Sequence, residues 1–148
     1  MIVETKYQNE IEINDNDVLC FDNGILGFEE NKKYVILPLV EGTPVFTLQS
    51  IENPNLAFVV IEPFTFFKDY EFDLSESTIS KLSIVSEQDV MVYVILTLEE
   101  PFEKTTANLQ GPIIINKQNN KARQIVLSNP IYQTKHLLKM NPSLKEGD

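Results

Sequence analysis

The sequence LAFVVIEPFTFFKDYEFDL, residues 56–74, combines the clearest fold signal in the chain with its most unusual surface signal. Its first part, residues 56–61, is an apolar run rich in β-branched residues that ends at Glu62-Pro63. Such a run is short for a helix, so it predicts a strand that is buried on both faces.

The second part of this stretch places aromatic rings next to carboxylates. Residues 70–74 alternate strictly, with Tyr70, Phe72 and Leu74 on one face and Glu71 and Asp73 on the other. One interpretation is an edge strand with a core face and a solvated acidic face. The other is a docking surface, because aromatic residues are enriched at the centres of protein interfaces. The two interpretations are compatible, and both stay open here.

Similar short runs, separated by turn residues, recur along the whole chain. They predict further strands over residues 2–5, 10–13, 18–21, 33–40, 45–51, 90–98, 105–109, 112–115 and 122–127. Pro38 suggests an edge position or a bulge, and the long apolar run 90–98 suggests a central strand. Ser75 is a good N-cap for a short helix over residues 76–82. Many short strands with one or two helical turns indicate a mostly β fold, a small antiparallel barrel or sandwich.

Length and composition bound the organisation of the chain. With 148 residues, of which 43% are hydrophobic, we expect one β domain over residues 1–140 and a flexible tail over 141–148. No apolar run approaches the roughly 20 residues of a membrane helix, and the N-terminus lacks the pattern of a signal peptide. We therefore expect a cytoplasmic protein without a membrane partner.

The net charge of −10 is distributed unevenly. Residues 61–103 hold ten acidic and two basic residues, whereas residues 104–148 hold seven basic and two acidic ones. Such a surface repels nucleic acid over most of its area and favours a basic protein partner. We therefore expect no direct contact with nucleic acid.

Catalytic and metal-binding residues are sparse. The single histidine, His136, lies in the basic C-terminal region, and the single cysteine, Cys20, lies between apolar residues that predict a buried, inert thiol. The acidic turn at residues 14–17 lacks the glycine and terminal glutamate of a calcium loop. We therefore expect no catalytic, metal or cofactor site.

The residues that mix aromatic surface with negative charge are the best candidates for contact with a partner. They fall in two segments of the acidic region: Phe67, Asp69, Glu71, Phe72, Asp73, Glu99, Glu100, Phe102 and Glu103. From the residues alone, the chain is an acidic, mostly β protein-binding module.

A set of short motifs adds a family resemblance. The motifs are FDNGILGFE at residues 21–29, LQS at 48–50, Pro54, LAFVV at 56–60, PF at 63–64, YEF at 70–72, TANLQGPI at 106–113 and QIVL at 124–127. In their order and spacing, over residues 1–136, the chain resembles the FliW family of flagellar assembly factors.

This resemblance implies a compact β-barrel-like regulator without catalytic residues. Members of the family bind flagellin in the cytoplasm, as a chaperone does, and also bind the translational repressor CsrA. When flagellin is secreted, the freed protein captures CsrA away from its RNA-binding surface, which relieves repression of flagellin translation. Two alternatives stay open. One is a generic acidic binding module or nucleic-acid mimic, and the other is a small-ligand barrel or enzyme with a deep polar pocket lined by His136 or Cys20.

Overall fold

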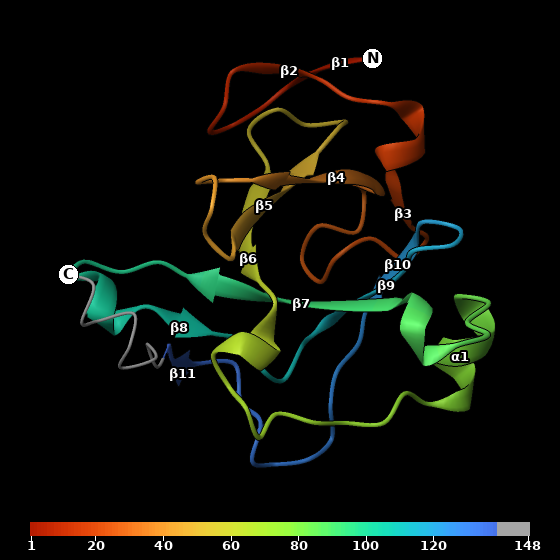
Figure 1. Ribbon diagram of the computed structural model, residues 1–148, viewed down its shortest axis with the longest axis vertical. Helices are drawn as coiled ribbons and strands as arrows, with labels where there is room; N and C mark the ends of the chain where they lie inside the picture. Colours follow the sequence, from red (N-terminus) through yellow and green to blue (C-terminus); the bar gives the residue numbers. More distant parts are fainter. Residues whose placement is uncertain (139–148) are drawn as a thin grey trace.

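Seven strands close into a barrel in the computed structural model, which describes residues 1–138 (Figure 1). Around the wall the order is β7-β6-β5-β4-β3-β10-β9, and β9 pairs back with β7. All neighbours are antiparallel except β3 and β10, which are parallel. The barrel strands are β3 (Leu19–Phe21), β4 (Lys33–Pro38), β5 (Val45–Ser50), β6 (Ala57–Ile61), β7 (Val90–Thr97), β9 (Ile113–Asn116) and β10 (Lys121–Gln124). The expected mostly β barrel is confirmed.

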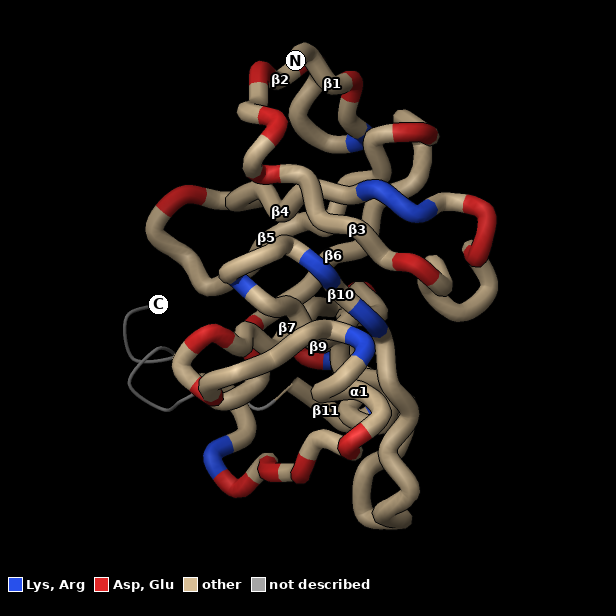
Figure 2. Tube along the Cα trace, turned by 90° about the vertical axis from the view of Figure 1, so that its right-hand side faces the viewer, with Lys and Arg blue, Asp and Glu red and all other residues tan. Residues whose placement is uncertain are grey.

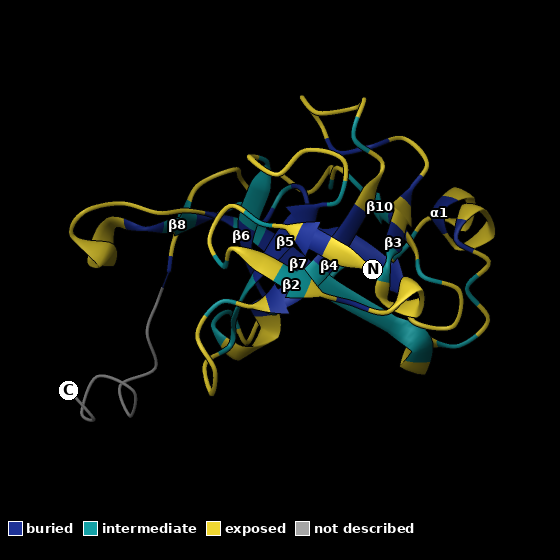
Figure 3. Cartoon of the chain, turned by 90° about the horizontal axis from the view of Figure 1, so that it is seen from above, coloured by how far each residue is buried: buried dark blue, intermediate teal, exposed yellow. Residues whose placement is uncertain are grey.

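The remaining elements lie outside the barrel wall. The hairpin of β1 and β2 packs over one side, and β8 and β11 extend the sheet from the far end of β7 as an arm, opposite α1 (Figures 1 and 3). These elements are β1 (Ile2–Glu4), β2 (Glu10–Glu12), β8 (Thr106–Ala107), β11 (His136–Leu137), the helix α1 (Glu76–Lys81), and the 3₁₀ helices η1 (Asp15–Asp17), η2 (Pro63–Thr65), η3 (Glu87–Asp89) and η4 (Phe102–Lys104). The expected tail, residues 141–148, lies outside the described residues.

The period of two along each strand divides the apolar residues between separate cores. In β7, Tyr93 packs inside the barrel with Phe21 and Leu48, whereas Val94 and Leu96 face outward into a second core. This second core lies between β6, β7 and the segments 66–72 and 127–138 that cover them. The run 90–98 is central as expected, because β7 pairs with β6, β8 and β9.

The predicted helix cap is confirmed, and one tight loop depends on a glycine. The Ser75 side chain accepts a hydrogen bond from the backbone N–H of Thr78 at 3.1 Å and begins α1 at the expected residue. Gly24 has φ +64°, and a Cβ there would come within 2.6 Å of the Glu29 backbone. The tight loop after β3 therefore requires glycine at this position.

Two expectations about single residues have different outcomes. Pro38 has an edge position, because at the end of β4 it pairs only with β5, although β4 as a whole lies between β3 and β5. Cys20 is exposed, not buried. In β3 the flanking Leu19 and Phe21 fill the barrel, and the period of two turns Cys20 outward.

Candidate protein-binding surface

The segment 70–75 crosses the outside of the barrel as an extended chain between η2 and α1 (Figure 1). Its alternation is as expected: Tyr70 is buried, Phe72 is half-buried, and Glu71 and Asp73 are exposed. The predicted edge strand, however, is wrong, because no strand within residues 1–138 pairs with this segment. One-sided burial against the second core produces the alternation without a β ladder.

Two tyrosines hold the segment in place. The Tyr70 hydroxyl donates to the buried carbonyl of Leu109 at 2.7 Å, and the Glu71 backbone N–H donates to the Tyr132 hydroxyl at 3.1 Å. The two tyrosine rings pack edge to face with centroids 4.7 Å apart. Burial raises the pKa of Tyr70, so its hydroxyl keeps its proton and goes on donating even at alkaline pH. The carboxylates of Glu71 and Asp73 therefore project from a fixed backbone.

The aromatic residues of this region divide between core and surface. Phe67 and Phe72 are half-buried against the second core, and the Phe67 ring lies 6.4 Å from the ring of His136. Phe64 was not among the predicted residues, yet it is 47% exposed, with its ring centroid 5.8 Å from that of Tyr70. The turn signal at Glu62-Pro63 was the available indication that the next side chain leaves the sheet.

Two grooves lie on either side of the extended segment and share Glu71, Phe72 and Asp73 as a common wall. The first, of about 480 Å³, we call the apolar groove; its apolar lining includes Phe64, Phe72, Ile79, Ile84, Val90 and Val92, and the exposed Glu87 also lines it. The second, of about 610 Å³, we call the acidic groove. Asp69, Glu71 and Asp73 line it, together with Leu127, Ile131 and Tyr132 from a later part of the chain. The predicted residues 69–73 thus lie between two concave surfaces.

The second predicted segment lies elsewhere on the molecule. The loop with Glu99, Glu100 and Glu103 is exposed, Phe102 within it is 44% exposed, and the Glu99 N–H donates to the Thr105 hydroxyl at 3.1 Å. This loop forms the tip of the β7–β8 arm, whereas the segment 70–75 runs toward α1 at the other end (Figures 1 and 3). The structure therefore does not bring the two predicted segments together.

Basic residues collect on a different side of the barrel. Lys33, Cys20 and Lys121 are paired across β4, β3 and β10 and are all exposed, so they form a row on the outer face. Figure 2 shows basic positions at the start of β4 and in β10, with acidic positions in many of the surrounding loops. A basic partner would accordingly be steered away from this face and toward the acidic loops.

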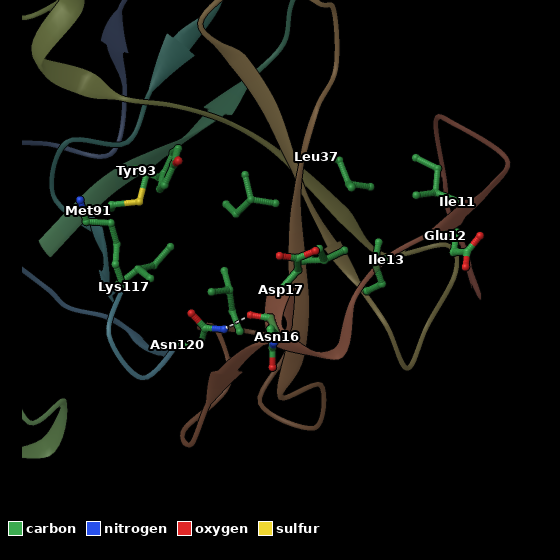
Figure 4. Close-up of a pocket in the computed structure, with 14 residues that line it drawn as sticks. Ile11, Glu12, Ile13, Asn16, Asp17, Leu37, Met91, Tyr93, Lys117 and Asn120 are labelled. Atoms are coloured by element: carbon green, nitrogen blue, oxygen red, sulfur yellow. Dashed lines mark hydrogen bonds between the residues drawn. The ribbon is translucent and has the colours of Figure 1, made fainter. Parts of the chain in front are cut away.

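A third pocket, of about 460 Å³, opens beside the mouth of the barrel (Figure 4). Apolar side chains such as Leu37 and Met91 line it, with Asp17 and Lys117 among the few charged groups, and Asn120 donates a hydrogen bond to the Asn16 carbonyl at its edge. Neither His136 nor Cys20 lines this pocket or either groove.

Other kinds of site have little basis in the described part of the chain. Within residues 1–138, no three His, Cys, Asp or Glu side chains are grouped as metal ligands. The same residues include no helix with the length and apolar character needed to span a bilayer.

Comparisons with known proteins agree on one family. The sequence model described as "FliW protein" matches residues 2–138. The flagellar assembly factor FliW of Bacillus subtilis (strain 168) is 53% identical over 136 residues, which are 92% of this chain and 95% of that protein. The one from Bacillus velezensis is 50% identical over 138 residues, 93% of this chain and 96% of that protein. A crystal structure of the flagellar assembly factor FliW superposes with a TM-score of 0.89 at 47% identity, covering 95% of this chain and 99% of that one.

Proposed function

Because the chain belongs to the FliW family of flagellar assembly factors, we propose that it binds flagellin and, when free of flagellin, binds and antagonises the translational repressor CsrA. Translation of flagellin is then coupled to its secretion. While flagellin accumulates, it occupies this protein and CsrA represses translation. Once flagellin is exported, the free protein withdraws CsrA from its target. The proposal places the protein in the cytoplasm, where both partners are made, and gives it no catalytic step.

The observation that carries the proposal is the fixed, carboxylate-bearing segment between two grooves. Glu71 and Asp73 stand on a backbone held by Tyr70 and Tyr132, beside apolar surface that a partner can cover. Aromatic and apolar contacts supply affinity at the centre of an interface, and surrounding charge supplies encounter rate and selectivity. This combination suits a partner with basic residues beside an apolar patch.

The switch requires that the two partners exclude each other. A protein that bound both independently could not report the loss of flagellin. Flagellin must also displace CsrA from this protein while flagellin is present, either because it binds more tightly or because it is in excess. The test is to titrate flagellin into a preformed complex with CsrA and to follow the release of CsrA by size-exclusion chromatography. A stable ternary complex would contradict the mechanism.

The docking residues are tested by reversing single charges. We expect Glu71→Lys and Glu103→Lys to weaken CsrA binding at low salt, with Glu41→Lys as the control, since Glu41 is exposed in the turn between β4 and β5. All three variants change the net charge equally, so general electrostatics affects them alike. If the first two variants fold normally and bind CsrA like the control, the proposed contact residues are wrong.

An acidic nucleic-acid mimic remains the second candidate. The observation in its favour is the net charge of −10. A mimic would occupy the RNA surface of its target and compete with RNA directly. Saturating RNA would then abolish binding of this protein to CsrA, whereas the proposed antagonist still binds the RNA complex.

A further inference from the structure

The edge of β4 that faces β3 is covered over only part of its length. β3 pairs with Lys33 and Tyr34, and the chain before Leu19 turns away into η1. Residues 35–38 therefore have β5 on one side and, within residues 1–138, no strand on the other. An uncovered strand edge presents backbone N–H and C=O groups with which another chain can pair.

The hydrogen bonds around β4 identify which backbone groups stay free on this edge. The Ile51 N–H donates to the Lys33 carbonyl at 2.9 Å. Just beyond the strand, the Leu39 N–H donates to the Val45 carbonyl at 3.1 Å. The odd-numbered residues of β4 therefore bond to β5, and the N–H and C=O of Ile36 point to the uncovered side. In the described part of the chain, neither of these two groups has a hydrogen-bond partner.

Pro38 closes the next position along this edge. It has no N–H, and its carbonyl accepts a hydrogen bond from the Gln8 side chain. The free edge is therefore one residue long, with one donor and one acceptor, both on Ile36. A single residue of an antiparallel chain reaches both groups, because the two residues of a hydrogen-bonded pair exchange two bonds.

The third pocket, of about 460 Å³, lies at this edge and touches both faces of β4. One part of its lining belongs to the barrel interior: Ile36, Met91, Tyr93 and Ile115. The other part belongs to the core between β4 and the β1–β2 hairpin: Ile11, Ile13, Val35 and Leu37. Figure 4 shows Met91 and Tyr93 on one side of the pocket and Ile11 and Ile13 on the other.

A chain that pairs with Ile36 places its side chains in both parts of the pocket. The residue opposite Ile36 points the same way as Ile36, into the mouth of the barrel. Its two neighbours point the same way as Val35 and Leu37, toward the hairpin. Both directions end on apolar side chains, so the pocket fits three consecutive apolar residues.

The charges at the rim are mostly acidic. Glu12 and Asp17 line the pocket and are exposed, and the one basic residue that lines it is Lys117. Glu10 in β2 and Asp15 in η1 add two exposed carboxylates to the adjoining elements. This charge favours Lys or Arg on the flanks of the apolar residues that enter the pocket.

We propose that the third pocket binds an extended segment of a partner protein, which has three consecutive apolar residues flanked by Lys or Arg and adds to β4 as a short antiparallel strand. Its central residue donates its N–H to the Ile36 carbonyl and accepts from the Ile36 N–H. The pocket shares no lining residue with the apolar groove or the acidic groove, so this site goes beyond the proposed function and does not depend on it.

The first test uses a fluorescently labelled peptide, Lys-Lys-Val-Leu-Val-Lys-Lys with blocked ends. Its binding is followed by anisotropy at about 50 mM salt, where electrostatic attraction is weakly screened. Methylation of the Leu nitrogen removes the N–H that donates to Ile36 and should weaken binding by about tenfold. Methylation of the following Val nitrogen is the matched control, because that N–H points away from β4, and it should change binding by less than about threefold.

Amide hydrogen exchange measured by NMR locates the peptide on the protein. In the free protein the Ile36 N–H should exchange faster than those of Val35 and Leu37, which bond to β5. Saturating peptide should slow the exchange of Ile36 by about tenfold or more, since the peptide then supplies the missing acceptor.

Charge reversal tests the acidic rim. Glu12→Lys should weaken binding of the peptide by about threefold or more at low salt. Glu41→Lys is the control with the same change of net charge, because Glu41 is exposed and does not line the pocket. A peptide with Glu in place of Lys should bind the wild-type protein more weakly than the basic peptide does.

Several outcomes would overturn the inference. Equal binding of the two methylated peptides would show that apolar side chains enter the pocket without pairing to β4. Protection of Val92 in place of Ile36 would put the peptide on β7, and an unchanged affinity of Glu12→Lys relative to Glu41→Lys would remove the selection for a basic flank. Absence of binding at about 1 mM protein would mean that the edge is not a docking site.

Discussion

Replacing Tyr70 by Phe should destabilise the protein by the value of one buried hydrogen bond. The side chain is only 4% exposed, and its hydroxyl donates to the Leu109 carbonyl at 2.7 Å. Phenylalanine keeps the edge-to-face contact with Tyr132, so packing is preserved while the donor is lost and a buried carbonyl is left unsatisfied. Such a loss costs about 1–2 kcal/mol of unfolding free energy. Urea unfolding followed by circular dichroism measures it.

Tyr34→Phe is the matched control for this substitution. Tyr34 is fully buried inside the barrel, between Phe21 and Phe58, but its hydroxyl has no hydrogen-bond partner among the described residues. Removing an unpartnered buried hydroxyl should leave the unfolding free energy unchanged or raise it by about 1 kcal/mol. If Tyr34→Phe loses as much stability as Tyr70→Phe, the hydrogen bond to Leu109 is not what distinguishes the two sites, and the reasoning is refuted.

Three further predictions concern stability and binding. Val94→Asp should lower the unfolding free energy by about 3–5 kcal/mol, because it places an unpaired carboxylate in the second core, whereas Val85→Asp on the exposed loop should change it by less than about 0.5 kcal/mol in the same urea assay. Stability should fall as the pH rises above 10, since the unfolded chain then releases tyrosine protons that the folded protein retains. Burial raises the pKa of Tyr34 and Tyr93 to about 12 and raises that of Tyr70 as well. Each tyrosine adds a slope of about −1.4 kcal/mol per pH unit, and a flat profile between pH 10 and 11.5 would contradict it. Finally, we expect long-range charge attraction to contribute more to the complex with CsrA than to the complex with flagellin. The CsrA complex should therefore weaken with salt more steeply, because charges separated by more than about 8 Å are screened at physiological ionic strength. Equal salt slopes in calorimetric titrations would remove the electrostatic part of the argument.

Much of the barrel could be predicted because its signals are local. Alternating runs located the strands, and Ser75 located the start of α1, since a cap depends only on neighbouring backbone groups. The predicted burial of Cys20 was wrong because apolar residues on both sides of a position are expected whether one face or both faces of the strand are buried. Its exposure follows because Leu19 and Phe21 face the barrel interior and the outer face of β3 is left uncovered at Cys20, which residues 18–21 do not encode by themselves.

The candidate surface was predictable only in part, for a related reason. The alternation at residues 70–74 correctly separated Tyr70 and Phe72 from Glu71 and Asp73, but it suggested a β ladder that is absent from this segment. The apolar groove joins Phe64, Ile79 and Val92, which lie on three elements. Their proximity depends on how α1 and the segment 70–75 pack on the barrel, so no spacing in the sequence reveals it.

The closure of the barrel has a consequence for synthesis of the chain on the ribosome. Strands β3 to β7 pair in sequence order, so they can assemble as they emerge, but they form an open sheet with free edges on β3 and β7. The β9–β10 hairpin covers both edges at once, with β9 on β7 and β10 on β3, and the contact on β3 joins residues about a hundred positions apart. Exposed edges invite pairing with other chains, and contacts so distant in sequence form slowly. The nascent protein is therefore most prone to aggregation after β7 has emerged and before Gln124 has, and a chain arrested in that interval should accumulate in the insoluble fraction.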